Sequence, residues 1–233
     1  MNKTTKIVAI LLGVAVVAFV AVSIINSITK ANEMAKYSEW DYIEGNSLNG
    51  NIADHIIGNK DAKVKIIEYA DFQCSACAVT FPYIHSIVEE YGDQVALIFR
   101  TYVISYHPNG NAVATAATAA GLQGYFEDYA TLAFSRQNEW YDLEGTERDN
   151  VLAGYLKTVS NGQADMEKYR SDLKSAAIKD KISFDRSLAI RVKLEGTPLI
   201  FINKEKYEVP STKESTFKAD LKAKIDEALK NAS

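Results

Sequence analysis

The chain has 233 residues, of which 47% are hydrophobic and 24% are charged, and its formal net charge is −4. This length provides for one domain, or for one domain with an insertion, and the composition is that of an ordinary globular protein. The acidic balance and the lack of any lysine- or arginine-rich run in the sequence argue against nucleic acid as a partner.

The first element is an apolar segment, Ile7–Ile28, that contains no charged residue. A helix of this length spans the ~30 Å hydrocarbon core of a bilayer. Lys3 and Lys6 precede the segment, so the positive-inside rule places the N-terminus in the cytoplasm and the remaining chain outside. The alternative is a signal peptide cleaved near Ala21–Ser23, which would make the protein secreted, although the apolar run is longer than in most signal peptides.

The next stretch, residues 29–51, is polar, and we interpret it as a tether between the anchor and a folded domain. His55–Lys63 supplies turn residues. Val64–Tyr69 is predicted to be a buried strand, and a helix then runs from the two cysteines to about Tyr91. Gln94–Ile104 is rich in β-branched and aromatic residues, which predicts a second buried strand.

From residue 109 to about 194 the pattern is helical. An alanine-rich run at 109–134 is followed by candidate helices at 149–160, 163–177 and 185–196. After this block, Thr197–Lys204 is predicted to be a strand and Tyr207–Pro210 a short one. Ser211 and Glu214 have the spacing of a capping box, which predicts the start of a final helix.

This order of elements predicts one α/β layer structure with an inserted all-helical domain, preceded by an N-terminal transmembrane helix. The anchor and a cytoplasmic tip take residues 1–28, and the tether takes 29–51. The α/β domain takes 52–108 and 195–233, and the helical insertion takes 109–194.

Two cysteines, Cys74 and Cys77, are the only ones in the chain, and they stand where the predicted strand gives way to the helix. A Cys-x-x-Cys in this position indicates a redox site. The helix N-terminus stabilises a thiolate on Cys74, and Cys77 lies close enough to resolve a mixed disulfide. A structural disulfide would close a loop too short to constrain the unfolded chain much. His55, His85 and His107 are too scattered to complete a metal site, so we expect no metal and no organic cofactor.

Two further features support a redox site. Glu68 lies in the middle of an otherwise apolar strand, where a carboxylate is costly without a role, and it could take the proton of the Cys77 thiol. The alternative is that Glu68 faces solvent from an edge strand. Thr197-Pro198 begins a buried strand, and a cis bond there could hold a substrate strand beside the dithiol; an ordinary trans proline is the alternative.

These residues together resemble the DsbA-type branch of the thioredoxin superfamily. The likeness is carried by "GNKDAKVKIIEYADFQCSAC", "HPNGNAVATAATAAGLQGYFEDYATLAF" and "GTPLIFINK", and it runs from about His55 to the C-terminus. The resemblance implies an extracytoplasmic thiol–disulfide oxidoreductase that acts on exported protein thiols and is reoxidised by a membrane redox partner. The bilayer is contacted through Ile7–Ile28. His107 is expected to cap a helix.

By the same resemblance, Cys74 is the attacking cysteine, Cys77 is its partner and Glu68 is the buried acid. Thr197-Pro198 is the cis-proline loop and, with Ser75-Ala76, contacts the substrate. Strongly oxidising members carry proline and histidine between the cysteines, whereas this chain has Ser75 and Ala76. We therefore expect a less depressed pKa at Cys74 and a less oxidising couple.

Three functions follow from the sequence. The first is oxidation of exported proteins through a mixed disulfide at Cys74. The second is a reductase or isomerase of the same fold. The polar segment 29–51 is too short for the dimerisation domain that isomerases of this superfamily usually carry, which argues against an isomerase but not against a reductase. The third is a thioredoxin-like module that binds peptides and has only incidental redox activity.

Overall fold

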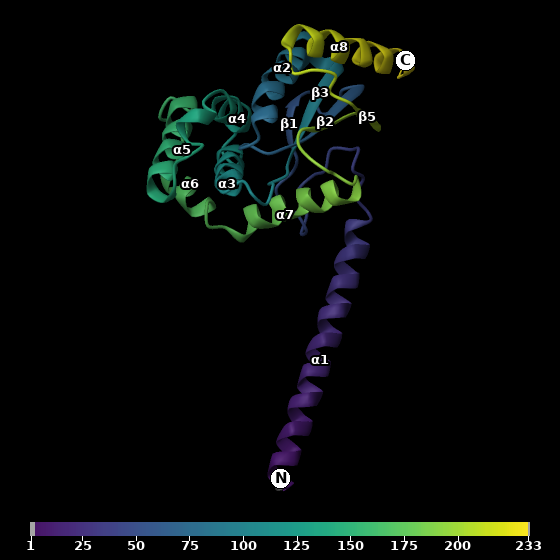
Figure 1. The fold of residues 1–233 in the computed structure, drawn as a ribbon, viewed down its shortest axis with the longest axis vertical. Helices are drawn as coiled ribbons and strands as arrows, with labels where there is room; N and C mark the ends of the chain where they lie inside the picture. The colour runs from purple at the N-terminus through teal and green to yellow at the C-terminus, as the bar shows by residue number, and fades with distance from the viewer. Residues whose placement is uncertain (1–2, 233) are drawn as a thin grey trace. The chain divides into compact units, whose positions relative to one another are not determined.

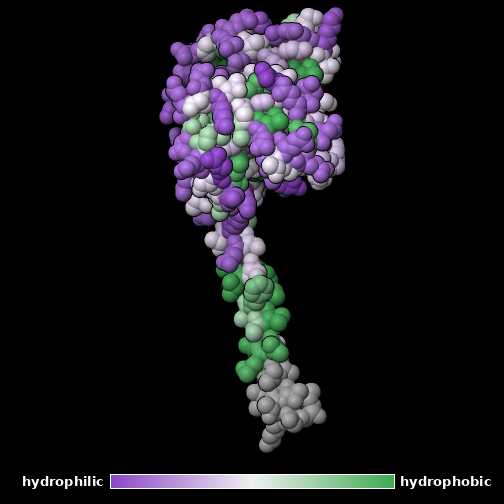
Figure 2. Space-filling view, turned by 90° about the vertical axis from the view of Figure 1, so that its left-hand side faces the viewer, coloured by the Kyte–Doolittle hydropathy of each residue, from purple (hydrophilic) through white to green (hydrophobic). Residues whose placement is uncertain are grey.

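The computed structural model describes residues 3–232, with side chains from residue 11 onward, as two compact units that meet between Ser38 and Glu39. The first unit is dominated by helix α1 (Lys3–Met34), which contains the predicted apolar segment. Within it, Leu11–Met34 is long and apolar enough to cross a membrane. Figure 2 shows the apolar side chains along this helix. Residues 1–2 of the predicted cytoplasmic tip lie outside the described residues.

The second unit is built on a five-stranded mixed sheet in the order β1-β3-β2-β4-β5. The central pair, β2 (Val64–Ala70) and β3 (Val95–Thr101), is parallel, and the other pairs are antiparallel. The outer strands are β1 (His55–Gly58), β4 (Leu199–Ile202) and β5 (Glu205–Tyr207). This arrangement confirms the predicted thioredoxin-like α/β fold, with helices α3 to α7 between β3 and β4.

Two predictions about strands were wrong. His55–Gly58 is not a turn, because it pairs with β3, with His55 opposite Phe99. The four residues are too few for a clear alternation of apolar and polar side chains. The last strand is Glu205–Tyr207 rather than Tyr207–Pro210. Asn203 adopts a φ of 54° just after β4, so the hairpin turns sooner than the apolar pattern indicates.

One helix follows β2, five lie between β3 and β4, and one ends the chain. They are α2 (Ser75–Tyr91), α3 (Gly110–Gly121), α4 (Phe126–Ser135), α5 (Gly145–Val159), α6 (Met166–Asp172), α7 (Ala176–Arg191) and α8 (Glu214–Asn231). Short 3-10 turns occur at Gly92–Gln94 and Gln137–Glu139. Figure 1 shows α2 and α8 on one side of the sheet and α7 on the other.

Two helices begin at a different residue from the predicted one, and a serine hydrogen bond explains each difference. The Ser175 hydroxyl accepts from the amide of Ile178, so α7 begins at Ala176, near the end of the predicted helix 163–177 and before the predicted helix 185–196. At the last helix, Ser211 accepts from the amide of Lys213 instead of forming a capping box. Helix α8 therefore begins at Glu214, three residues later than predicted.

An aromatic cluster fastens the helical block to the helix that carries the cysteines. Phe134 of α4 lies with its ring centroid 4.8 Å from that of Phe81 on α2 and 4.7 Å from that of Phe72. Phe81 also meets Phe99 of β3 edge to face, at 5.8 Å. The block and the start of α2 thus share one buried core.

The second half of the predicted tether packs onto the folded unit. Ile43 is buried, and its amide donates to the Asp54 carboxylate at 3.1 Å while its carbonyl accepts from the Asp54 amide at 2.9 Å. The side chain of Asn49 is also fully buried. Residues from Glu39 onward form one compact unit. This division does not test the predicted boundaries between the tether, the α/β domain and the helical insertion, so those boundaries stay predictions.

Candidate active site

The dithiol lies where β2 passes into α2. Cys74 occupies the N-cap position of α2, with its amide bonded to the carbonyl of Asp71 at 3.0 Å and its carbonyl accepting from the amide of Ala78 at 3.1 Å. Its side chain is partly exposed, whereas Cys77, one turn into the helix, is completely buried. Both cysteines are free thiols in this structure. The fold therefore presents one sulfur to the outside and keeps the other beneath it.

The surroundings of Cys74 favour its thiolate. The thiol of Cys77 donates toward the Cys74 sulfur, and the amides of Ala76 and Cys77, which are unpaired in the first helical turn, also face it. Against the opposing effect of partial burial, these donors lower the pKa of Cys74 to about 5. This value lies between the ~3.5 of DsbA and the ~7 of thioredoxin.

The second cysteine has the opposite environment. Burial raises the pKa of the Cys77 thiol well above its usual range, and its hydrogen bond to Cys74 and the negative charges of Cys74 and Glu68 raise it further. At neutral pH the reduced pair therefore holds one thiolate, on Cys74, and one thiol, on Cys77.

Glu68 lies under the dithiol in the centre of the sheet. Its strand, β2, runs between β3 and β4, with Phe99 and Ile200 opposite Glu68, so the alternative of a solvent-facing edge position is wrong. The carboxyl group is fully buried, and neither oxygen has a hydrogen-bond partner among the described residues. Burial, and secondarily the charge on Cys74, raises its pKa to about 8. A carboxyl group poised in this way can give or take a proton near neutral pH.

The Thr197-Pro198 peptide bond is cis, and it lies beside the reactive sulfur. The Cys74 sulfur lies 3.4 Å from the carbonyl oxygen of Thr197, across 123 residues of sequence. The buried Thr197 hydroxyl also faces the Cys74 sulfur, and its hydrogen bond contributes to the lowered pKa of Cys74. Ser75, at the rim, is exposed, and Ala76 is partly exposed. The structure thus brings together the site residues that the sequence indicated, with Ser75 and Ala76 at the surface.

Sequence reasoning missed the polar side chains that hold the loops around Cys74. The buried Asp71 carboxylate accepts from the amides of Gln73 and Ile104, and it lies 2.8 Å from Nδ1 of His107. The prediction that His107 caps a helix was therefore wrong, since its partner is a side chain 36 residues earlier. Gln137 donates to the carbonyl of Cys74 at 3.3 Å. The polar residues Asp71 and Gln73 beside the first cysteine were the available signal.

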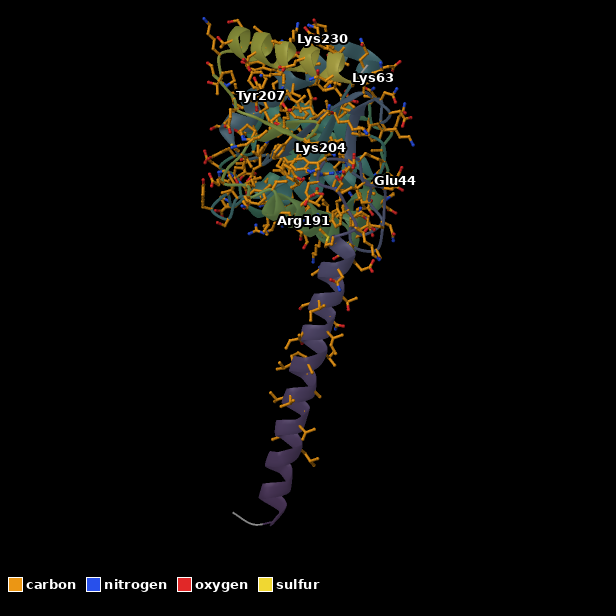
Figure 3. The ribbon with its side chains drawn as sticks, turned by 90° about the vertical axis from the view of Figure 1, so that its right-hand side faces the viewer. Glu44, Lys63, Arg191, Lys204, Tyr207 and Lys230 are labelled. Carbon is orange, nitrogen blue, oxygen red and sulfur yellow. The ribbon has the colours of Figure 1, made fainter. Side chains whose placement is uncertain are left out.

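Two other kinds of site were considered. No group of three or more histidine, cysteine or acidic side chains suited to a metal ion occurs among the described residues. A hollow of about 770 Å³ lies between the β4–β5 hairpin and the end of α8, on the face seen in Figure 3 where Lys63, Lys204 and Tyr207 are labelled. Its walls contain neither cysteine, and it lies apart from the dithiol.

The sheet order, the dithiol at the start of α2 and the cis-proline beside it define a protein of the thioredoxin fold class. The model of a family described as thioredoxin matches residues 50–223, and the chain belongs to this family. The resemblance to the thioredoxin superfamily predicted from the sequence is confirmed by this match, and solved structures of BdbD and of α-DsbA1 of Wolbachia pipientis share the fold.

The relatives fall into two groups. A Na⁺/H⁺ antiporter NhaA of Herminiimonas arsenicoxydans is 30% identical over 149 residues, which cover 64% of this chain and 22% of the antiporter. The chain thus spans about a fifth of the length of that relative. A probable disulfide bond formation protein D of Bacillus cereus is 29% identical over 194 residues, covering 81% of this chain and 82% of that one. Among solved structures, oxidised BdbD of Bacillus subtilis superposes with a TM-score of 0.62 at 21% identity, covering 82% of this chain and 99% of BdbD.

Proposed function

We propose that this chain is a membrane-anchored protein disulfide oxidoreductase that introduces disulfides into exported proteins. The observation that carries the proposal is the asymmetric dithiol: an accessible Cys74 whose pKa is lowered to about 5, above a buried Cys77 whose pKa is raised. A stabilised thiolate on the reduced enzyme makes Cys74 a good leaving group, and it favours the transfer of the disulfide to a client.

The reaction begins with the Cys74–Cys77 disulfide. A client thiolate attacks the sulfur of Cys74, forming a mixed disulfide and releasing Cys77 as a thiolate. The neutral carboxyl group of Glu68 gives its proton to Cys77, whose high pKa favours the thiol. A second client thiolate then attacks the client sulfur of the mixed disulfide and releases Cys74 as a thiolate. The client loses two electrons and two protons, the dithiol gains both electrons, and Glu68 regains its proton from solvent.

The position of the Thr197-Pro198 loop supports the proposal that this loop holds the client. It lies against Cys74, and the chain leading into β4 there is partly exposed. A client segment that extends along this loop would meet its backbone groups while its own cysteine meets Cys74. Exposed Ser75 and partly exposed Ala76 complete the surface on the other side of the sulfur.

Helix α1 supports the proposed location outside the cytoplasm. Its apolar part is long enough to span a bilayer, and Lys3 and Lys6 at its start favour an N-terminus in the cytoplasm. The dithiol would then act outside the cytoplasm, where disulfides persist. Each turnover leaves the enzyme reduced, so a membrane redox partner must take up two electrons to restore the disulfide. The name of the Bacillus cereus relative, disulfide bond formation protein D, agrees with this direction.

The test uses the full chain in detergent micelles, oxidised at Cys74–Cys77, with a reduced and unfolded two-cysteine substrate. The wild type should oxidise the substrate stoichiometrically, and Cys74→Ser should reduce the rate to that of the buffer. Cys77→Ala, with its Cys74 first converted to a mixed disulfide with glutathione, should pass that disulfide to a one-cysteine variant of the substrate, which displaces glutathione from Cys74. This substrate–Cys74 mixed disulfide should accumulate, because no Cys77 thiol is left to release the substrate. A peptide-binding module would bind the substrate equally well with and without Cys74 and would oxidise none of it, which would overturn the proposal.

A further inference from the structure

A small hollow of about 280 Å³ opens beside the reactive cysteine, on the side of the helical block. Its floor is Gln73, the residue directly before Cys74 in the chain. One wall comes from the loop between β3 and α3, with Tyr106 and His107, and the other from the loop before α5, with Tyr141 and Asp142. The volume falls below the ~300 Å³ at which small-molecule sites begin, so it suits a single side chain.

The hollow is held open by buried hydrogen bonds. The side chain of Gln73 accepts from the amide of Asn109 at 2.7 Å and donates to the carbonyl of Tyr141 at 3.3 Å, which ties both walls to the floor. Asn109, also buried, donates to the carbonyls of Tyr141 and Leu143, each at 2.9 Å. A hollow braced in this way is present before any client arrives, which lowers the cost of binding.

The mouth of the hollow is aromatic and acidic. Tyr106 is 76% exposed and Tyr141 is 39% exposed, although large apolar rings are usually covered. The carboxylates of Asp142 and Glu144 line the same hollow, and neither forms an ion pair among the described residues. The cation nearest in sequence, Arg148, is bonded to Asp149 and Asn109 instead.

The remaining charged group in the wall does not offset this acidity. His107 lies with its Nδ1 2.8 Å from the buried carboxylate of Asp71, so any positive charge on it is matched there. Exposed tyrosine rings beside unpaired carboxylates form a site for an ammonium or guanidinium group, through cation–π contact and charge attraction.

We propose that this hollow takes a lysine or arginine side chain of the client, next to the client cysteine that reacts with Cys74. The inference rests on the proposed function, and it specifies which clients are preferred. Gln73 lines the hollow and directly precedes Cys74, so residues next to the client cysteine of a mixed disulfide lie within reach of it. A basic residue there would speed capture of the client, and an acidic one would slow it.

The experiment compares pairs of two-cysteine peptides that differ only by lysine or glutamate at one of the three positions on either side of the first cysteine. Oxidised full-length protein in detergent oxidises each peptide at low ionic strength. Each rate is divided by the rate of the same peptide with neutral hydroxyethyl disulfide, which removes the effect of the charge on the peptide's own thiol. At the best position the lysine peptide should react about fivefold faster than its glutamate partner, and high salt should reduce the ratio.

Variants of the protein test whether the preference for the lysine peptide arises at this hollow. The double change Asp142→Asn and Glu144→Gln should bring the ratio close to one, and Tyr106→Ala should lower it in part. Glu147→Gln, an exposed acid outside the hollow, is the matched control and should leave the ratio unchanged. Equal normalised rates at every position, or a preference that survives the double change, would overturn the inference alone. Oxidation of neither peptide would overturn the proposed function and this inference with it.

Discussion

Two neighbouring residues of β2 lie on opposite faces of the sheet and in opposite electrostatic environments. Glu68 lies under the dithiol, and its carboxyl group is buried without a partner. Tyr69, equally buried, accepts a hydrogen bond at 3.1 Å from Arg100, its partner in the parallel register with β3. On one face of the sheet the buried carboxyl group of Glu68 thus has no hydrogen-bond partner. On the other face the buried guanidinium group of Arg100 is hydrogen-bonded.

The face that carries Arg100 holds a complete ionic network. Arg100 and Lys181 are the cations, Asp54 and Asp185 are the anions, and all four are buried. Arg100 bonds Asp54 at 2.8 Å, and Lys181 bonds Asp54 at 2.9 Å and Asp185 at 2.5 Å. Arg100 also donates to the carbonyls of residues 39 and 41, so the network fastens the segment before β1 to β3 and α7.

The difference shows how the same fold separates stability from chemistry. On the network face each of the four buried charges has a partner of opposite sign, and the network holds three segments of the chain together. Leaving Glu68 unpaired raises its pKa to about 8 and keeps its proton available next to Cys77. A group that is costly to bury alone is retained where a proton must move.

The largest effect should follow from breaking the paired network. Lys181→Met leaves two buried carboxylates facing one arginine, and we expect a loss of about 3–5 kcal/mol in the free energy of unfolding. The control, Lys181→Met with Asp185→Asn, rebalances the charge and keeps the acceptor for the amide of Thr101, so it should lose clearly less. Urea unfolding of the full chain in detergent measures both. Equal losses in the two variants would mean that the charges do not act as a network.

Unlike Lys181→Met, the substitution Glu68→Gln should raise the free energy of unfolding relative to the wild type at alkaline pH. Because the folded-state pKa of Glu68 is raised from 4.5 to about 8, its neutral form favours folding below pH 4.5, and this contribution is lost as the pH rises through 8. Against the glutamine variant, the oxidised wild type should therefore lose on the order of 3 kcal/mol between pH 4.5 and 9. Unfolding curves at a series of pH values test this, and parallel profiles for the two proteins would contradict the buried, unpaired state of Glu68.

A smaller effect concerns the thiolate. Since the pKa of Cys74 is lowered from 9.0 to about 5, the thiolate stabilises the reduced, folded protein fully above pH 9, and this contribution is lost as the pH falls through 5. The ultraviolet absorbance of the thiolate should reach half its amplitude near pH 5, with Cys77 silent beyond pH 9. Cys74→Ser should abolish the transition, whereas Lys181→Met should leave its midpoint in place. A midpoint of the thiolate absorbance near pH 9 would contradict the lowered pKa of Cys74 and with it the difference between the two cysteines.

The sequence predicted the reactive face better than the network face. Cys74, Cys77 and Glu68 lie within ten residues, and their chemistry is unusual enough to be noticed in a short stretch. The Thr197-Pro198 loop was indicated by its position at the start of a predicted buried strand and then by the resemblance. The network could not be predicted, because Asp54 and Lys181 are 127 residues apart in sequence and neither lies in a motif. His55–Gly58 failed as a strand prediction for a related reason, since only its pairing with β3 makes it one.

The most direct test of the account is the reduction potential of the Cys74–Cys77 pair, measured with the full chain in detergent and glutathione buffers. Stabilisation of the Cys74 thiolate predicts an oxidising couple, at about −180 mV or higher, in the range of protein disulfide isomerase and DsbA. Such a value would support the donation of disulfides to exported proteins. A value near the about −270 mV of thioredoxin would contradict it, and would show that with Ser75 and Ala76 between the cysteines this fold serves as a reductase.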